Sequence, residues 1–120
     1  MANTTTHRGS CHCGKVRYEV DLDLSKPVTS CNCSMCSRAG TLLAFVPAEH
    51  FRLASGEDAL SEYRFNKKVI AHLFCSTCGI KPFARGTGPD GKPMVAVNVR
   101  CLDDVDVGAL TVQSFDGRSM

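Results

Sequence analysis

The sequence contains no tryptophan, and aromatic residues make up only 7% of its 120 residues. It also contains no apolar run approaching the ~18 residues that a membrane-spanning helix requires, so we expect no membrane partner. Residues 1–10 are polar, unlike the apolar segment of a secretory signal. These absences favour a cytoplasmic protein, and the length is that of one domain with a modest core.

The sequence also lacks an excess of charge of either sign. Its 14 Lys and Arg residues almost balance its 12 Asp and Glu residues, which leaves a net charge of +2. A domain that binds nucleic acid usually carries a much stronger basic excess. We therefore expect no nucleic acid as a partner.

Long helical patterns are absent, whereas the alternation typical of strands is common. Apolar residues alternate with others over 16–20 and 94–99, and further strands are predicted over 41–46, 60–65, 68–74 and 110–115. The helical candidates are single turns, one over 34–40 and one starting at Pro47, and the turn-rich segment 86–93 predicts a hairpin loop. We therefore predict a mostly β fold with little helix.

Cysteine, in contrast, is abundant, with eight residues. Because thiols stay reduced in the cytoplasm, these cysteines indicate metal binding or catalysis rather than a disulfide framework. Closely spaced thiolates favour zinc over other common divalent ions. Seven of the cysteines form three clusters with the spacings CxC, CxCxxC and CxxC: Cys11 and Cys13, then Cys31, Cys33 and Cys36, then Cys75 and Cys78.

The positions of glycine indicate how the clusters divide. A glycine directly follows the second cysteine of the first and third clusters, at positions 14 and 79, whereas serine follows the middle cluster. A metal-binding turn often needs a positive φ at that point, which glycine accepts readily. We therefore predict one four-sulfur structural zinc site, formed by Cys11, Cys13, Cys75 and Cys78.

Three cysteines then remain for the middle cluster. Three protein ligands with a fourth position open are typical of reactive zinc, so Cys31, Cys33 and Cys36 are candidate catalytic ligands of a second zinc. A helical turn after Cys33 would direct its amides at these thiolates, and Arg38 lies close enough in sequence to offset their charge. In an alternative interpretation, Cys101 supplies a fourth sulfur and makes this site structural as well.

Other polar residues near the clusters receive a structural interpretation. His12 and His72 are interpreted as structural or solvated side chains rather than as metal ligands. Four basic residues flank the paired cysteines and are expected to balance the charge of a four-thiolate zinc: Lys15, Arg17, Lys81 and Arg85.

The order and flanking residues of the motifs match a known family over nearly the whole chain. The motifs are Cys11-His-Cys13-Gly14 with Val16-Arg17-Tyr18, Cys31-Asn-Cys33-Ser-Met-Cys36, Phe74-Cys75-Ser-Thr-Cys78-Gly79, Val97-Asn98-Val99-Arg100-Cys101-Leu102 and Phe115-Asp116-Gly117. Together they resemble the glutathione-dependent formaldehyde-activating enzyme family, which also includes centromere protein V.

This resemblance implies a fold, a metal content and a reaction. In the family, the CxC and CxxC cysteines bind a structural zinc, and the CxCxxC cysteines bind a second, more labile zinc. The fold is a β-tent of small antiparallel sheets around zinc knuckles, which implies a single zinc-binding domain over 7–120 after a frayed start at 1–6. The family reaction is that of a carbon-sulfur lyase, and it joins glutathione to formaldehyde. A small thiol such as glutathione is therefore the implied partner.

Two further functional classes stay open. A non-catalytic zinc-binding module for a thiol ligand or a protein partner would keep both metals without turnover. An enzyme similar to methionine sulfoxide reductases would use Cys101, which follows Arg100, as its nucleophile. No Ser-His-Asp or Cys-His arrangement is evident in the sequence, and it identifies no general acid.

Overall fold

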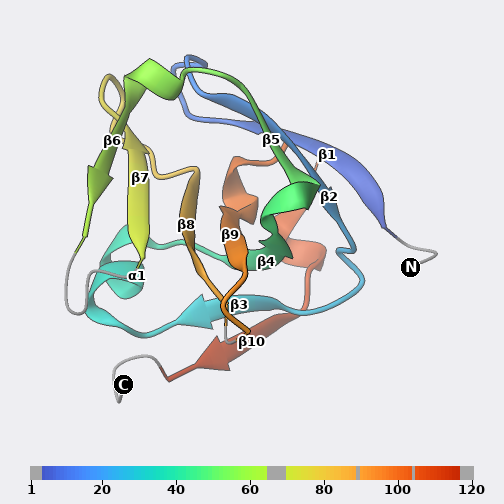
Figure 1. The fold of residues 1–120 in the computed structure, drawn as a ribbon. Coiled ribbons are helices and arrows are strands. Elements are labelled where there is room, and N and C mark those ends of the chain that lie inside the picture. Colours follow the sequence, from blue (N-terminus) through green and yellow to red (C-terminus); the bar gives the residue numbers. More distant parts are fainter. Residues whose placement is uncertain (1–3, 65–69, 89, 104, 117–120) are drawn as a thin grey trace.

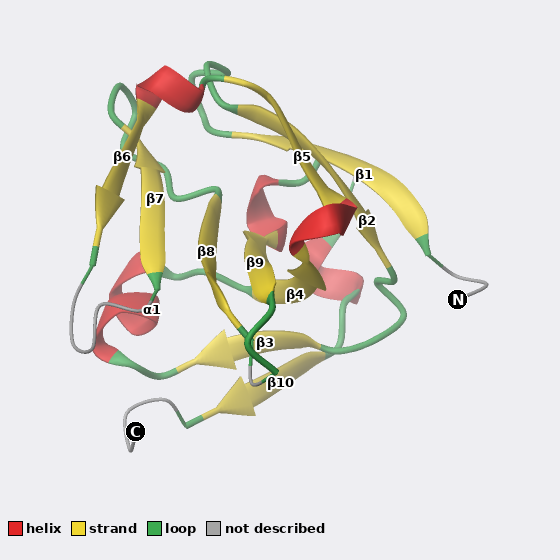
Figure 2. Ribbon diagram, in the orientation of Figure 1, coloured by secondary structure: helices red, strands yellow, loops and turns green. Residues whose placement is uncertain are grey.

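The computed structural model describes residues 4–64, 70–88, 90–103 and 105–116. Its strands form two sheets, one with the order β1-β2-β5 and one with the order β10-β3-β4-β9-β8-β7-β6 (Figure 1). Helix in the described residues is limited to α1 and short 3-10 turns (Figure 2). None of these helices is long and apolar enough to cross a bilayer. The prediction of a mostly β fold with little helix is confirmed.

The smaller sheet is antiparallel throughout. Its strands are β1 (Thr5–Ser10), β2 (Arg17–Leu22) and β5 (Phe51–Ser55). Along β2, Tyr18, Val20 and Leu22 are buried while the residues between them are more exposed. This is the period of two expected for a strand with one face on the core. The turn after β1 carries the first cysteine pair.

The larger sheet is mixed, because β10 runs parallel to β3 while its other pairs are antiparallel. This differs from the purely antiparallel sheets that the resemblance implied. The chain passes through the 3-10 turns η3 (Val99–Cys101) and η4 (Val107–Ala109) and then enters β10 in the direction of β3. The strands are β3 (Val28–Cys31), β4 (Leu43–Pro47), β6 (Leu60–Tyr63), β7 (Ala71–Cys75), β8 (Phe83–Thr87), β9 (Pro93–Asn98) and β10 (Val112–Phe115).

Both sheets contribute to one core. Tyr18 stacks on Phe51 with ring centroids 5.1 Å apart, and Phe83 of the larger sheet lies 5.8 and 4.5 Å from these two rings. Aromatic contacts of this kind add to the stabilisation that comes from burial. Buried aliphatic residues from both sheets and from the segments next to their strands complete the core: Val16, Val20, Leu22, Val28, Leu42, Val46, Leu73, Val95, Val97, Val99 and Leu102.

The structure confirms most of the predicted elements and adds others. The predicted strands correspond to β2, β4, β6, β7, β9 and β10, and the predicted single turns to α1 (Ser34–Ala39) and η1 (Ala48–His50). The sequence did not predict β1, β3, β5 and β8, and β1 begins at Thr5, ahead of the predicted start of the domain. Residues 65, 68–69 and 89, which belong to predicted elements, lie outside the described part of the chain.

Candidate metal centres

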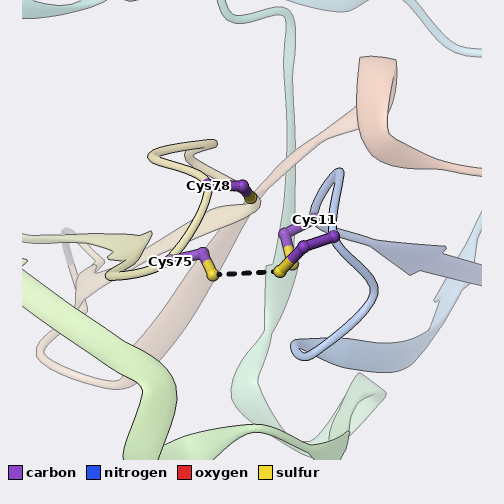
Figure 3. A group of neighbouring side chains, drawn as sticks. Cys11, Cys75 and Cys78 are labelled. Carbon is purple, nitrogen blue, oxygen red and sulfur yellow. Dashed lines mark hydrogen bonds between the residues drawn. The ribbon is translucent and has the colours of Figure 1, made fainter.

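The first and third cysteine clusters of the sequence meet at one point and form a single four-sulfur group, which is called the first cluster from here on. The four Sγ atoms of Cys11, Cys13, Cys75 and Cys78 all lie within 4.8 Å of one another. The Sγ of Cys13 is 3.6 Å from the Sγ atoms of Cys11 and Cys75. Figure 3 shows Cys11, Cys75 and Cys78 coming together from the two loops. Because ligands 2.3 Å from a tetrahedral zinc lie about 3.8 Å apart, these sulfurs already have nearly the spacing that zinc requires.

Each loop is a tight turn that depends on its glycine. The amide of Gly14 donates to the carbonyl of Cys11 over 3.3 Å, and the amide of Gly79 donates to the carbonyl of Cys75 over 2.8 Å. The φ angles of these glycines are +84° and +79°, in the left-handed region that other residues rarely adopt. The positive φ predicted for the glycine after each cysteine pair is therefore confirmed.

Backbone amides surround the sulfurs of this first cluster. The amide of Val16 lies 3.4 Å from the Sγ of Cys11. A hydrogen bond from the amide of Ile80 lowers the pKa of Cys78 to about 6. Hydrogen bonds from the amides of Cys78 and Thr77 likewise lower the pKa of Cys75. At Cys75 and Cys78 the arrangement favours the thiolate, which is the form that binds a metal ion. At Cys13 the amide of Lys15 lowers the pKa, but desolvation and hydrogen bonds with the neighbouring thiols raise it to about 11.

The middle cluster of the sequence, which is also the second cluster or three-sulfur cluster below, is formed where β3 ends and α1 begins. The Sγ atoms of Cys31, Cys33 and Cys36 lie within 4.8 Å of one another. Cys33 is the N-cap of α1, and its Sγ accepts from the amide of Cys36 over 3.3 Å. The amide of Cys33 in turn lies 3.5 Å from the Sγ of Cys31. The predicted helical turn therefore does direct amides at these sulfurs.

The three thiols have different environments. Burial has the largest single effect on the pKa of Cys33 and raises it, but the hydrogen bonds from the amides of Cys36 and Met35 and from the thiols of Cys36 and Cys31 together leave this pKa below its usual value. Burial raises the pKa of Cys36 to about 11. Within the described residues, no fourth cysteine, histidine or carboxylate joins the three sulfurs. The arrangement offers a metal ion three soft ligands and leaves a fourth position for another molecule.

Cys101 lies in neither cluster. Its thiol is 4.0 Å from the carbonyl oxygen of Lys81 and 3.6 Å from the Nδ2 of Asn98. Burial raises its pKa to about 11, and the charges of Cys11 and Cys78, both in the first cluster, raise it further. The alternative in which Cys101 closes the middle cluster therefore receives no support, and such a thiol is poorly suited to be a nucleophile.

A positive charge acts on the middle cluster, and it is that of Lys81 and not that of the expected Arg38. The side chain of Arg38 donates to the carbonyl of Ser34 on the exposed side of α1. Lys81 was expected beside the first cluster, yet the charges that act on its ammonium are those of Cys36, Cys33 and Cys31. The electrostatic partners of Lys81 are therefore the thiols of the middle cluster, and its role beside the first cluster stays a prediction.

The remaining candidates occupy structural positions. Lys15 donates to the hydroxyl of Thr77 over 3.2 Å near the first cluster. Arg85 lies over the ring of Phe83, with its guanidinium carbon 5.2 Å from the ring centroid. His72 is buried and belongs to neither group of sulfurs, and burial lowers its pKa to about 4. His12 is exposed and also lies outside both groups of sulfurs, so the interpretation of both histidines as non-ligands fits the structure.

A hollow that the sequence did not indicate lies against the middle cluster. It has a volume of about 570 Å³ and includes Cys31 and Cys36 in its wall. Arg100 of η3 also lines it, as does Thr41, whose buried hydroxyl has no hydrogen-bond partner among the described residues. Its other lining residues are mostly polar: Ser30, Asn32, Ser37, Gly40, Leu42, Ser114, Phe115 and Asp116.

Comparisons with known proteins give a consistent result. A family model described as glutathione-dependent formaldehyde-activating enzyme matches residues 6–115. The fold is similar to that in a crystal structure of a protein from Rhodobacter sphaeroides, with a TM-score of 0.76 and 31% sequence identity. This similarity covers 88% of the present chain and 99% of the other chain. The family match spans both cysteine clusters.

Proposed function

The chain belongs to the glutathione-dependent formaldehyde-activating enzyme family, and from this premise we propose that it is a zinc-dependent enzyme of the carbon-sulfur lyase type. Its substrate would be glutathione with formaldehyde, or a related glutathione adduct. The thiol sulfur would bind at the cluster of Cys31, Cys33 and Cys36. The eight free cysteines fit a reducing, cytoplasmic location.

The two cysteine clusters would hold two zinc ions with different tasks. The four-sulfur cluster provides all the ligands of a closed tetrahedral site, and it would hold a structural zinc. The three-sulfur cluster would hold a second, more labile zinc, because it provides one ligand fewer. Zinc in such an open site stabilises a bound thiolate over the thiol.

The observation that carries the proposal is the hollow beside the three-sulfur cluster. Its volume of about 570 Å³ lies in the range of small-ligand sites, and Cys31 and Cys36 form part of its wall. A tripeptide seated there would have its thiol beside the cluster. Its remaining polar groups would meet a wall that combines polar side chains with apolar surface.

Two residues of the hollow suit the ends of a peptide thiol. Arg100 would provide a guanidinium, which binds carboxylates through paired hydrogen bonds, and glutathione has two carboxylates. The buried hydroxyl of Thr41 would gain the hydrogen-bond partner that it lacks among the described residues. Affinity would be micromolar to millimolar, because a flexible tripeptide loses much of its binding energy on ordering.

Deprotonation alone would give a small rate gain. A free thiol with a pKa of about 8.5 is already a few per cent thiolate at neutral pH, so full ionisation increases the reactive form only about 30-fold. Holding the thiolate in place against the carbonyl carbon would have to supply the rest. The chain's contribution is therefore mainly to bind, orient and ionise the thiol.

The test is a titration of the cobalt-substituted protein with glutathione. Cobalt bound to sulfur absorbs visibly, so a thiolate that joins the second site should change the spectrum. The control is Cys33→Ser, in which serine preserves the N-cap of α1 and only the metal site is damaged. Glutathione should change the wild-type spectrum and leave that of Cys33→Ser unchanged. S-methylglutathione, which cannot ionise, should have much less effect.

Turnover needs a separate measurement, because formaldehyde and glutathione combine without help. Catalysis requires a rate above the blank that scales with enzyme and disappears in Cys33→Ser. Binding without acceleration would favour a non-catalytic thiol-binding module. An unchanged cobalt spectrum, with the second site loaded, would refute glutathione as the ligand.

A further inference from the structure

Lys81 carries a buried charge that needs a partner. The residue lies in the connection between β7 and β8, and its Nζ atom is fully buried without a hydrogen-bond partner among the described residues. An ammonium group in such a position costs several kcal/mol unless an opposite charge faces it. A negative charge that faces Nζ would therefore hold Lys81 in its ammonium form.

Hydrogen bonds of Asn98 join Lys81 to the wall of the hollow beside the middle cluster, because Asn98 donates to the carbonyl of Lys81 and accepts from the amides of Leu42 and Arg100, which line that hollow together with Cys31 and Cys36. Burial lowers the pKa of Lys81, while the thiols of Cys36, Cys33 and Cys31 act in the opposite direction. Burial raises the pKa of Cys36, and the charge of Lys81 opposes that increase. His72, which also feels the charge of Lys81, has a pKa lowered to about 4 and is neutral at physiological pH. Lys81 is thus the buried cation on this side of the cluster.

The backbone of Lys81 is fixed in place. Its carbonyl accepts from the Nδ2 of Asn98 over 3.0 Å. The Oδ1 of Asn98 accepts from the amide of Arg100 over 3.2 Å, and Arg100 lines the hollow. Pro82, the next residue, is fully buried, and its carbonyl accepts from the hydroxyl of Tyr18. This part of the chain cannot readily withdraw the ammonium from the cluster.

We propose that Lys81 is the internal counter-ion of the three-sulfur cluster, a positioning residue that retains the second metal and favours an anionic fourth ligand. Three thiolates and one divalent ion carry a net charge of −1, which the ammonium of Lys81 neutralises. Addition of a thiolate then leaves a charge of −1 instead of −2. The proposal rests on the proposed function for the identity of the fourth ligand only.

The experiment compares Lys81→Met with Lys15→Met. Methionine matches the length of the lysine stem without its charge, and Lys15 is the matched control because it is an exposed lysine beside the first cluster. Competition with a chelator gives the affinity of each site for zinc. Lys81→Met should weaken the second site tenfold or more and leave the first unchanged, because it removes a unit charge at short range. Lys15→Met should change neither site.

A second measurement uses stability and does not depend on ligand. With the metal site damaged by Cys33→Ser, the ammonium of Lys81 has lost part of its counter-charge, so Lys81→Met should raise the midpoint of denaturant unfolding. In the wild-type background loaded with zinc, the same substitution should not raise it. A reversal of sign between the two backgrounds supports the counter-ion role.

Several results would overturn this inference. One is a second-site zinc affinity in Lys81→Met within twofold of the wild type, and another is equal weakening of both sites. An unfolded Lys81→Met protein would also contradict it, since removing a buried charge should not prevent folding. Failure of wild-type protein to bind glutathione would refute the proposed function, yet the zinc affinities would still decide the role of Lys81.

Discussion

Loss of the first cluster should unfold the protein, whereas loss of the second should not. The informative substitution is Cys78→Ser, because Cys78 is only partly buried and a serine hydroxyl there can still reach water. The effect then reports loss of the metal rather than burial of a new polar group. Cys33→Ser is its counterpart in the second cluster, since Cys33 is also partly buried and serine preserves the helix cap.

The difference can be estimated from the separation of the ligands. Cys13 and Cys75 are 62 positions apart, whereas the three ligands of the second cluster fall within six residues. A cross-link that closes the longer loop removes about 2 kcal/mol more conformational entropy from the unfolded chain. The first cluster also joins the turn after β1 in the smaller sheet to the end of β7 in the larger sheet.

The total effect of the first metal is far larger than this difference. Structural zinc contributes about 10 to 16 kcal/mol in small domains, which equals or exceeds the usual net stability of about 5 to 15 kcal/mol. Cys78→Ser should therefore be insoluble or lack the far-ultraviolet circular dichroism of the wild type. Cys33→Ser should fold and bind one zinc instead of two. A folded Cys78→Ser protein without zinc in the first cluster would refute this reasoning.

Three further predictions test individual residues. Gly79→Ala should cost about 1 to 2 kcal/mol in denaturant unfolding, because φ is +79° while a Cβ there would meet no atom within 4 Å. The buried imidazole of His72 should titrate near pH 4 by NMR. Because its pKa is lower in the folded state than in the unfolded state, the stability of the protein should fall as the pH drops from about 6.5 toward 4. His72→Phe should weaken that pH dependence. Arg100→Gln should reduce glutathione affinity about tenfold without loss of either metal, as measured by calorimetry and zinc content.

The sequence was sufficient to divide the cysteines because the relevant signals are local. The two glycines after the paired cysteines mark turns that need a positive φ, and both have it. The helical turn over 34–40 was also predictable, because Ser34 lies at its start and Gly40 ends it in a left-handed conformation. Features that depend on a few adjacent residues could therefore be predicted without the fold.

The strands that the sequence did not predict lack a clear alternating pattern. β1 contains mainly polar residues, and only Gly9 within it is buried. Its position is instead determined by pairing with β2 along its whole length, from Thr5 opposite Leu22 to Ser10 opposite Arg17. A threonine run in an exposed edge strand carries β propensity but no hydrophobic period. Pairing with β2, and not a pattern within its own residues, therefore makes this segment a strand.

The hollow and the counter-ion could not be predicted because they combine distant segments. The walls of the hollow come from residues near 30, 40, 100 and 115, which the parallel pairing of β10 with β3 and the turn η3 bring together. Lys81 is three residues from Cys78, so sequence proximity favoured the first cluster. Its electrostatic partners depend on how the chain turns before β8, and no local sequence pattern indicates them.

The two clusters compensate their negative charge in different ways, and the difference bears on their tasks. The first uses fixed amides, among them those of Val16 and Ile80, while its nearby Lys15 is exposed to solvent. Four cysteines would enclose a metal ion there, so no further ligand would need to be accommodated. The second adds the buried ammonium of Lys81 to its helix amides. A closed structural site would gain little from that costly group. An open site gains more from it, because each anionic ligand that enters adds charge that only a nearby cation can offset.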